Sequence, residues 1–324
     1  MMGFSEACER FTSYLRNERN LSSHTVSTYR FGLDKFREFI TDQGITGVSE
    51  ISSDIIRSFV SFYRSKGIAS ASINVWLAAI KSLFRFLQLK SLTVNDPTLA
   101  VGSLKKNKRL PSYFSDDQMS FMLDQPATEG LANSTELDNF MSVRDKAMIE
   151  LMYSSGLRVS ELVSLDLDRV YLDARQVKVV GKGSKERIVP MGIPALKALN
   201  AYLDIRNNWA RADETALFVS KYGTRTTSRN VEMRLKIYAR THSVGVDIYP
   251  HKLRHSFATA MVSSSHNVRA VQELLGHERL STTQIYSHTD IAALARVYEQ
   301  AHPRDRMEQH QTLLRKTETS DDLS

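Results

Sequence analysis

Apolar residues in the first hundred positions repeat at the three- and four-residue spacing of amphipathic helices. Within 26–40 they follow one helix face, and within 70–89 they form the strongest single stripe of the chain. The segments 21–25 and 52–54 stand before such runs and carry side-chain oxygens that accept hydrogen bonds at helix N-termini. The pattern therefore predicts four helices packed around one small core.

A basic segment follows this helical region. Asn95-Asp96-Pro97 ends the helical pattern, and 105–111 contains four basic residues and no acidic residue. Such a segment is either a solvated tether or a stretch that follows a DNA backbone, and both interpretations stay open. The predicted domains are an N-terminal helical, DNA-clasping domain over 1–104, a basic linker over 105–112 and a catalytic domain over 113–303 with a C-terminal docking helix.

The second domain mixes helices with a short hairpin. A helix over 143–153 ends at Ser154-Ser155-Gly156, so Arg158 opens the next helix. Alternating apolar positions in 176–180 and 186–190 predict two strands, joined by a turn that contains two glycines. The remainder to 303 is predicted to be helical, with a capping segment at 115–118, whereas 304–324 is polar without apolar periodicity and is predicted to be a disordered tail. The predicted fold class is mainly α with a small β-sheet.

Composition narrows the function only slightly. The chain has 324 residues and a formal net charge of +7, which fits a nucleic-acid partner and fits many other enzymes as well. Cys8 is the one cysteine, so no internal disulfide can form and a reducing compartment is favoured. No run approaches the ~18 apolar residues of a membrane span, and the N-terminus lacks the pattern of a signal peptide. We therefore expect a cytoplasmic protein.

Candidate chemistry is concentrated in the second half of the chain. Arginine forks bind the non-bridging oxygens of a phosphate in pairs. Phosphoryl transfer asks a protein mainly for positioning and charge stabilisation, and a tyrosine phenol can act as its nucleophile. The residues that combine these properties, and that we predict to be catalytic, are Arg158, Lys182, His251, Arg254, His277 and Tyr286.

The motifs around these residues are specific. They are Gly156-Leu157-Arg158-Val159-Ser160-Glu161-Leu162, Gly181-Lys182-Gly183-Ser184-Lys185-Glu186-Arg187, His251-Lys252-Leu253-Arg254-His255-Ser256-Phe257-Ala258-Thr259, Leu274-Leu275-Gly276-His277 and Ser281-Thr282-Thr283-Gln284-Ile285-Tyr286-Ser287-His288. In this order, over about residues 4–303, they resemble the tyrosine recombinases, the integrase family of DNA strand exchangers. Within it the sequence is most similar to the bacterial Xer recombinases, and the ending 297–304 resembles the XerC branch. The resemblance implies a SAM-like core-binding domain followed by an α+β tyrosine recombinase catalytic domain.

The resemblance also implies roles for the cationic residues. Arg158 and Arg254 would hold the two non-bridging oxygens of the scissile phosphate. Glu161 lies one helical turn from Arg158 and is predicted to orient its guanidinium. Lys182, at the tip of the hairpin, would be the general acid that protonates the leaving 5′-oxygen.

Tyr286 would be the nucleophile, which forms an O-(3′-phospho-DNA)-tyrosine intermediate. His251 would carry its proton and His277 would donate to the phosphate. His251 and His255 have the i, i+4 spacing of a zinc site, but position 252 is Lys and position 254 is Arg, which would repel a divalent cation. We therefore predict no metal and no cofactor, and a packed or supporting role for His255.

DNA contacts outside the catalytic set are predicted from local charge. Residues 221–240 hold six basic residues against one acid, and 225–230 opens a helix with capping groups that suit a phosphate. A similar arrangement begins the helix after Lys66. A solvated basic face is the alternative for both. The candidate DNA-binding residues are Lys66, Ser70, Ser72, Asn74, Lys105, Lys106, Lys221, Arg225, Arg229 and Asn230.

The resemblance implies strand exchange by four protomers on two duplexes, through a Holliday junction. The XerC likeness implies resolution of chromosome dimers at cell division, with a related XerD-like recombinase in a heterotetramer and an FtsK-like septal DNA translocase. The helix over 290–301 would dock on a neighbouring protomer through Leu294, Val297 and Tyr298, unless it packs within its own chain. The alternatives are a phage, integron or transposon integrase, a DNA-binding protein with an inactive site, and a type IB topoisomerase.

Overall fold

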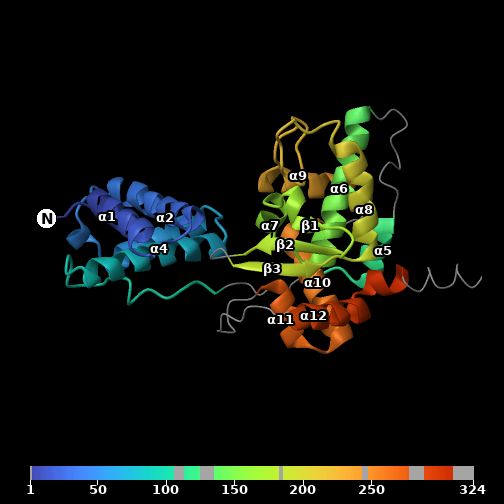
Figure 1. The fold of residues 1–324 in the computed structure, drawn as a ribbon. Coiled ribbons are helices and arrows are strands. Elements are labelled where there is room, and N and C mark those ends of the chain that lie inside the picture. Colours follow the sequence, from blue (N-terminus) through green and yellow to red (C-terminus); the bar gives the residue numbers. More distant parts are fainter. Residues whose placement is uncertain are drawn as a thin grey trace, which may run out of the picture. The chain divides into compact units, whose positions relative to one another are not determined.

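The computed structural model describes residues 2–105, 113–124, 135–181, 185–242, 247–276 and 288–308. The chain divides into two compact units, Met1–Leu110 and Pro111–Ser324, and each unit has its own hydrophobic core (Figure 1). In the described ranges no helix is long and apolar enough to span a membrane. Helices dominate both units and the second contains one small sheet, which confirms the predicted fold class.

The N-terminal unit is a four-helix domain, as predicted. Ser22 and Ser52 cap their helices by accepting hydrogen bonds from the backbone of Thr25 and Ile55. Aromatic rings fill the core, where Phe59 packs edge-on against Phe36 and Phe39. Its helices are α1 (Phe4–Asn17), α2 (Ser23–Thr41), α3 (Ser53–Ser65) and α4 (Ser70–Leu89), with a short 3-10 turn η1 (Val48–Glu50) between α2 and α3.

The C-terminal unit surrounds a long central helix, α6, which packs against α8 along its length and against α10 (Figure 1). Its helices are α5 (Asp116–Asp124), α6 (Glu136–Ser155), α7 (Val159–Val163), α8 (Ile193–Arg206), α9 (Ser228–Thr241), α10 (Pro250–Ser265), α11 (Val268–Leu275) and α12 (His288–Ala301), with a 3-10 turn η2 (Leu167–Arg169). Its strands are β1 (Val170–Tyr171), β2 (Gln176–Val180) and β3 (Glu186–Pro190).

The sheet has the order β1-β2-β3 and is antiparallel throughout. The two predicted strands are β2 and β3, and their register pairs Val180 with Glu186 next to the turn. Val177, Val179 and Val189 are buried, so one face of the hairpin packs on the core. The sequence analysis missed β1, because a strand of two residues is too short to show an alternating pattern.

The C-terminal segment after α12 corrects one prediction. Residues 304–308 were expected to belong to a disordered tail, but 303–308 are helical and folded onto the domain. Arg304 is buried and bridges Asp124 and Glu150, with both distances 2.8 Å. Asp305 is also buried and accepts a hydrogen bond of 2.7 Å from the backbone of Ile193. The polar composition was misleading because these charges are paired inside the protein. Residues 309–324 lie outside the described part of the chain.

Helix α12 packs within its own chain, on α10, α11 and β3 (Figure 1). Tyr298 is 1% exposed, and its hydroxyl lies 2.7 Å from Ser154 Oγ on α6. Leu294 is partly buried against the same core. Tyr298 is therefore a core residue of this protomer, and docking of the helix on a neighbouring protomer stays a prediction.

The pH dependence of stability tests the packing after α12. His302 is buried between the rings of Tyr153, Phe257 and Tyr298, and burial, together with the nearby charge of Arg304, lowers its pKa to about 3. Because the pKa of histidine in an unfolded chain is ~6.5, the unfolded state takes up a proton below that pH and the folded state does not. His302 therefore lowers the unfolding free energy of the protein progressively as the pH falls below 6.5. The unfolding free energy of His302→Leu, measured relative to wild type, should be about 2 kcal/mol higher at pH 5 than at pH 7.5.

The measurement is urea unfolding followed by Trp209 fluorescence in a Trp76→Phe background, because Trp209 belongs to the C-terminal unit. His266→Asn replaces an exposed histidine with positive φ and serves as the control. A difference in unfolding free energy between His302→Leu and wild type that does not change with pH would contradict the lowered pKa of His302.

Candidate active site

One buried carboxylate organises the site. Glu161, on α7, is 2% exposed, and its Oε1 accepts hydrogen bonds from Arg158 Nη1 at 2.7 Å and Arg187 Nη1 at 2.8 Å. Its Oε2 accepts from Arg187 Nη2 at 3.0 Å and from the backbone nitrogen of Arg158 at 2.9 Å. Arg254 Nη1 lies 3.9 Å from the same oxygen. The predicted partners Arg158 and Arg254 therefore meet at Glu161, together with a third arginine.

The electrostatics of this cluster favour an anion. Burial by itself would raise the pKa of Glu161, but the hydrogen bonds and charge of Arg187, joined by donors from Arg158, bring that pKa below its usual value. Burial and then the charge of Arg158 lower the pKa of Arg254 to about 10. Three guanidinium groups share one carboxylate, so the cluster keeps a net positive charge at neutral pH.

Local backbone geometry puts Arg158 in place. Helix α6 ends at Gly156, whose φ of +59° is left-handed and suits a residue without Cβ. Arg158 is then the N-cap of α7, where the carboxylate of Glu161 reaches back to its backbone nitrogen. The carbonyl of Gly156 also accepts a 2.5 Å hydrogen bond from Arg254 Nη1. The same turn therefore orients both predicted clamp arginines.

The C-terminal end of α11 also holds the arginines, through its backbone carbonyls. The last carbonyls of a helix lack partners within the helix and carry partial negative charge. Here three consecutive carbonyls accept from the three arginines: Leu274 from Arg187 Nε at 3.0 Å, Leu275 from Arg254 Nη2 at 2.5 Å and Gly276 from Arg158 Nη2 at 3.4 Å. His277 is the next residue in the chain.

Helix α10 carries two predicted residues in its first turns. His251 is exposed at the start of the helix, and Arg254, one turn further, is 11% exposed in its side chain. His255 is half-buried, 3.5 Å from Thr259 Oγ1, and its ring packs against Tyr113. This agrees with a packed role for His255.

Three predicted catalytic residues, Lys182, His277 and Tyr286, lie outside the described residues. The described chain reaches Gly181 before Lys182 and Gly276 before His277. Gly181 donates a 2.7 Å backbone hydrogen bond to Lys185 across the hairpin that holds Lys182. Tyr286 falls between Gly276 and the start of α12. Their positions relative to the arginine cluster therefore stay a prediction.

Sequence reasoning missed Arg187. It lies on β3 two residues before Val189, so the alternation of the strand puts both side chains on the buried face. A charged residue in phase with buried valines was a readable signal for a paired internal charge. The residue was quoted as part of a motif but was given no role.

Comparisons with known proteins identify the family to which the chain belongs. The chain matches the phage integrase family over residues 117–292 and the N-terminal SAM-like domain of phage integrases over residues 8–90. It is 40% identical over 298 residues to the tyrosine recombinase XerC of Vibrio campbellii, covering 92% of both chains. It is also 40% identical over 302 residues to XerC of Vibrio cholerae, covering 93% of this chain and 94% of the relative.

The chain belongs to the phage integrase family of tyrosine recombinases. It is an enzyme of site-specific DNA recombination and is similar to XerC. The fold also matches XerH bound to its palindromic difH substrate, with a TM-score of 0.66 and 20% identity over 90% of this chain and 84% of that one. A lambda integrase dimer bound to a core site gives a TM-score of 0.64 and 17% identity, over 88% of this chain and 99% of that one. At these identities the structural matches show the shared fold alone.

Among the candidate DNA contacts of the recombinase, the side chains of Arg225 and Asn74 bind the backbone of a distant segment. Arg225 pairs with Asp166 at 2.5 Å and donates to the carbonyls of Val163 and Leu165. The amide of Asn74 exchanges two hydrogen bonds with the backbone of Leu104. Both side chains therefore hold loops in place, whatever they do with DNA.

The other candidates on described residues are largely open to solvent. Lys66, Ser72, Lys105, Lys221 and Arg229 are exposed, whereas Ser70 and Asn230 are half-buried. Asn230 lies in the first turn of α9, where its backbone nitrogen is capped by Thr227, as the sequence predicted. Lys106 lies outside the described residues. DNA contact stays a prediction for all of them.

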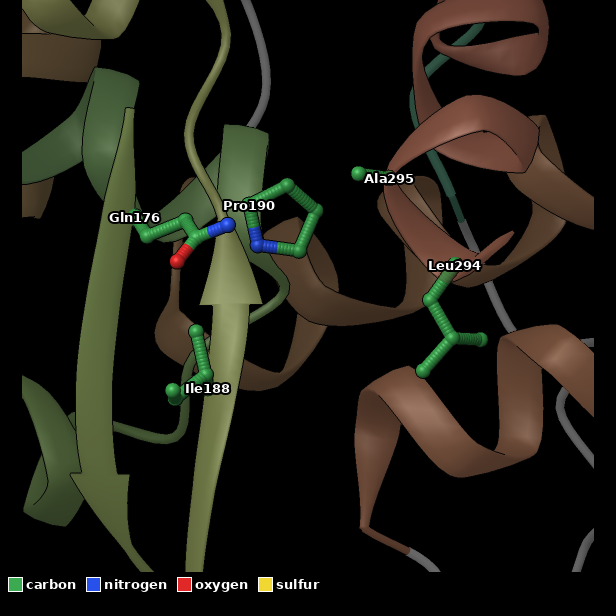
Figure 2. A pocket seen from close by; sticks show the side chains of 5 residues that line it. All are labelled: Gln176, Ile188, Pro190, Leu294 and Ala295. Atoms are coloured by element: carbon green, nitrogen blue, oxygen red, sulfur yellow. The ribbon is translucent and has the colours of Figure 1, made fainter. Parts of the chain in front are cut away.

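A separate shallow pocket lies between the outer face of the hairpin and α12 of the recombinase (Figure 2). Its lining is almost entirely apolar and contains no charged side chain, so it offers nothing to hold a phosphate. It lies on the face of β3 opposite Arg187. The lining residues are Gln176, Ile188, Pro190, Leu294 and Ala295.

Gly156→Ala tests the turn that positions the arginines. An added Cβ would meet Phe257 Cδ1 at 2.4 Å, in a backbone conformation with φ +59°. We expect the C-terminal unit to lose about 2–4 kcal/mol of unfolding free energy, since strain and overpacking act together. Urea unfolding followed by Trp209 fluorescence measures the loss.

Gly44→Ala is the matched control, because its φ is +74° and nothing lies within 4 Å of an added Cβ. It should cost its own unit only about 1 kcal/mol, from backbone strain alone. Equal costs at the two glycines would show that contact with Phe257 has no part in the effect.

Proposed function

We propose that this recombinase cuts DNA by attack of Tyr286 on a phosphodiester and rejoins it to a new partner through a Holliday junction. The observation that carries the proposal is the convergence of Arg158 and Arg254 on one buried carboxylate and on the end of α11, directly before His277. Two guanidinium groups held at a positive site suit the two non-bridging oxygens of a phosphate.

The proposed cleavage step exchanges one phosphate ester bond for another. Tyr286 Oη bonds to phosphorus and the bond from phosphorus to the 5′-oxygen breaks, leaving a 3′-phosphotyrosine and a 5′-hydroxyl. The phenol proton passes to His251, and Lys182 protonates the leaving oxygen. His277 donates a hydrogen bond to the phosphate as negative charge grows. A 5′-hydroxyl from another strand reverses the step, so the covalent link conserves the bond energy and the chemistry needs neither ATP nor a metal.

The biological role is proposed from resemblance. Relatives of 40% identity over nine-tenths of the chain carry the name XerC, which supports resolution of chromosome dimers at cell division. The proposed partners are a double-stranded recombination site, a second XerD-like recombinase in a heterotetramer and an FtsK-like DNA translocase at the septum. Work on the chromosome would take place in the cytoplasm.

Replacing the nucleophile tests the chemistry. Wild type, incubated in EDTA with nicked suicide duplexes that carry candidate Xer sites, should form a protein–DNA adduct that survives SDS. Tyr286→Phe should form none, because the phenyl ring has no oxygen to bond to phosphorus. Gel electrophoresis of end-labelled DNA measures the adduct, with and without a candidate XerD-like partner.

Tyr222→Phe removes the hydroxyl of an exposed tyrosine (69% exposed) and should leave the adduct unchanged. An adduct that persists in Tyr286→Phe would exclude this nucleophile. Cleavage that requires a divalent metal and leaves no adduct would exclude the reaction class.

A change of leaving group tests Lys182. A thiolate leaves without a proton, whereas an alkoxide needs one, so replacing the bridging 5′-oxygen by sulfur removes the need for a general acid. Lys182→Ala should slow cleavage of ordinary DNA by about 100-fold or more, and cleavage of the sulfur substrate by less than about threefold. Single-turnover adduct formation measures both rates. Equal losses on the two substrates would assign Lys182 a role other than proton donation.

A further inference from the structure

We infer that Arg187 is a positioning residue, which shares the Glu161 carboxylate with Arg158 so that this carboxylate neither fully neutralises Arg158 nor draws Arg254 away from an anion. The inference rests on the proposed role of these two arginines as the phosphate clamp. Arg187 itself has only 7% of its side chain exposed and would not touch the phosphate.

Each of the three guanidinium nitrogens of Arg187 binds an acceptor of the protein. Nη1 and Nη2 bind the two oxygens of Glu161 at 2.8 and 3.0 Å, and Nε binds the carbonyl of Leu274 at 3.0 Å. Arg158 differs, because 34% of its side chain is exposed and its Nη2 has only a 3.4 Å contact with Gly276. The side chain of Arg254 is 11% exposed and gives one hydrogen bond from each terminal nitrogen to a backbone carbonyl, which leaves one N–H on each nitrogen for an anion.

Counting acceptor positions explains why the third arginine matters. A carboxylate offers about four lone-pair positions. At Glu161 two are filled by Arg187 and two by the side chain and backbone of Arg158, which leaves Arg254 outside at 3.9 Å. Without Arg187, two positions of a buried carboxylate would be empty, at a high desolvation cost. Arg254 is the nearest cation that does not already bind the carboxylate, and it would close on these positions, away from the phosphate.

The same side chain ties together three segments that carry predicted catalytic residues. Through β3 it is part of the hairpin that holds Lys182, through Glu161 it reaches α7, and through Leu274 it reaches the chain just before His277. Gly276 makes room for it, because an added Cβ there would lie 3.2 Å from Arg187 Cζ. A shift of Arg187 would therefore be transmitted to all three segments.

Lysine cannot replace this arrangement. A guanidinium is planar and presents parallel donors that match a carboxylate, with Nε left for a third acceptor. An ammonium is a compact point charge and cannot bind both carboxylate oxygens and the Leu274 carbonyl in the same geometry. Arg187→Lys consequently keeps the charge and removes the geometry.

The experiment measures single-turnover adduct formation at saturating protein, and DNA affinity separately, on the nicked duplexes described above. Arg187→Lys should form the adduct about tenfold more slowly, and Arg187→Met about 100-fold more slowly, since transition-state stabilisation is lost without a direct DNA contact. The dissociation constant for DNA should stay within about threefold of wild type.

A second substitution separates positioning from mere structural support. In Arg187→Met the unshared negative charge of Glu161 neutralises the clamp, so Glu161→Gln in the same protein should restore adduct formation at least about fivefold. A purely structural role of Arg187 predicts slower adduct formation in the double variant, because that variant has lost more buried hydrogen bonds.

Arg144→Lys is the matched control: Arg144 is fully buried, pairs with Asp145 at 2.7 Å and binds the Val219 carbonyl. It should lower thermal stability and leave the cleavage rate of folded protein unchanged.

The outcomes are distinct. A wild-type rate in Arg187→Lys, or no gain from Glu161→Gln in Arg187→Met, would overturn the inference and leave the proposed function intact. No adduct from wild type, with or without a partner recombinase, would overturn the proposed function itself. Should Arg187→Met fail to fold, Arg187→Gln takes its place in the same comparison.

Discussion

The active-site geometry of this recombinase depends on one buried carboxylate. Glu161 would be costly to bury as an unpaired charge, since desolvation of an ion in a protein interior amounts to several kcal/mol. Four hydrogen bonds from Arg158 and Arg187 offset that cost. The requirement to satisfy one anion therefore fixes α7 and β3 relative to each other.

The end of α11 completes the arrangement through a second set of unsatisfied acceptors. Its last carbonyls need donors, and the arginines need acceptors for the nitrogens that Glu161 does not occupy. Arg254 donates hydrogen bonds to the carbonyls of Leu275 and Gly156, and it thereby joins α10 to α11 and to the end of α6. The result is a compact group of guanidiniums with an excess of positive charge, which an anion such as a phosphate would relieve.

The described residues that precede and follow the Tyr286 segment pack within the C-terminal unit. On one side the chain leaves the arginine cluster at Gly276. On the other it enters α12, whose Tyr298 is buried against Ser154, and it continues to the paired charges of Arg304. The described residues on either side of this segment thus belong to the same folded unit as Arg158 and Arg254.

The sequence by itself determined the helices of the N-terminal unit and the hairpin of β2 and β3, because periodicity and capping residues are local properties. Its motifs also predicted the clamp arginines. Only the tertiary structure decided what the isolated charges do. Arg225, Arg304 and Asp305 look like ordinary surface charges along the chain, yet their partners are up to 180 residues away. Whether a polar side chain is solvated, paired inside the protein or available to a ligand depends on such distant partners, and no local pattern encodes them.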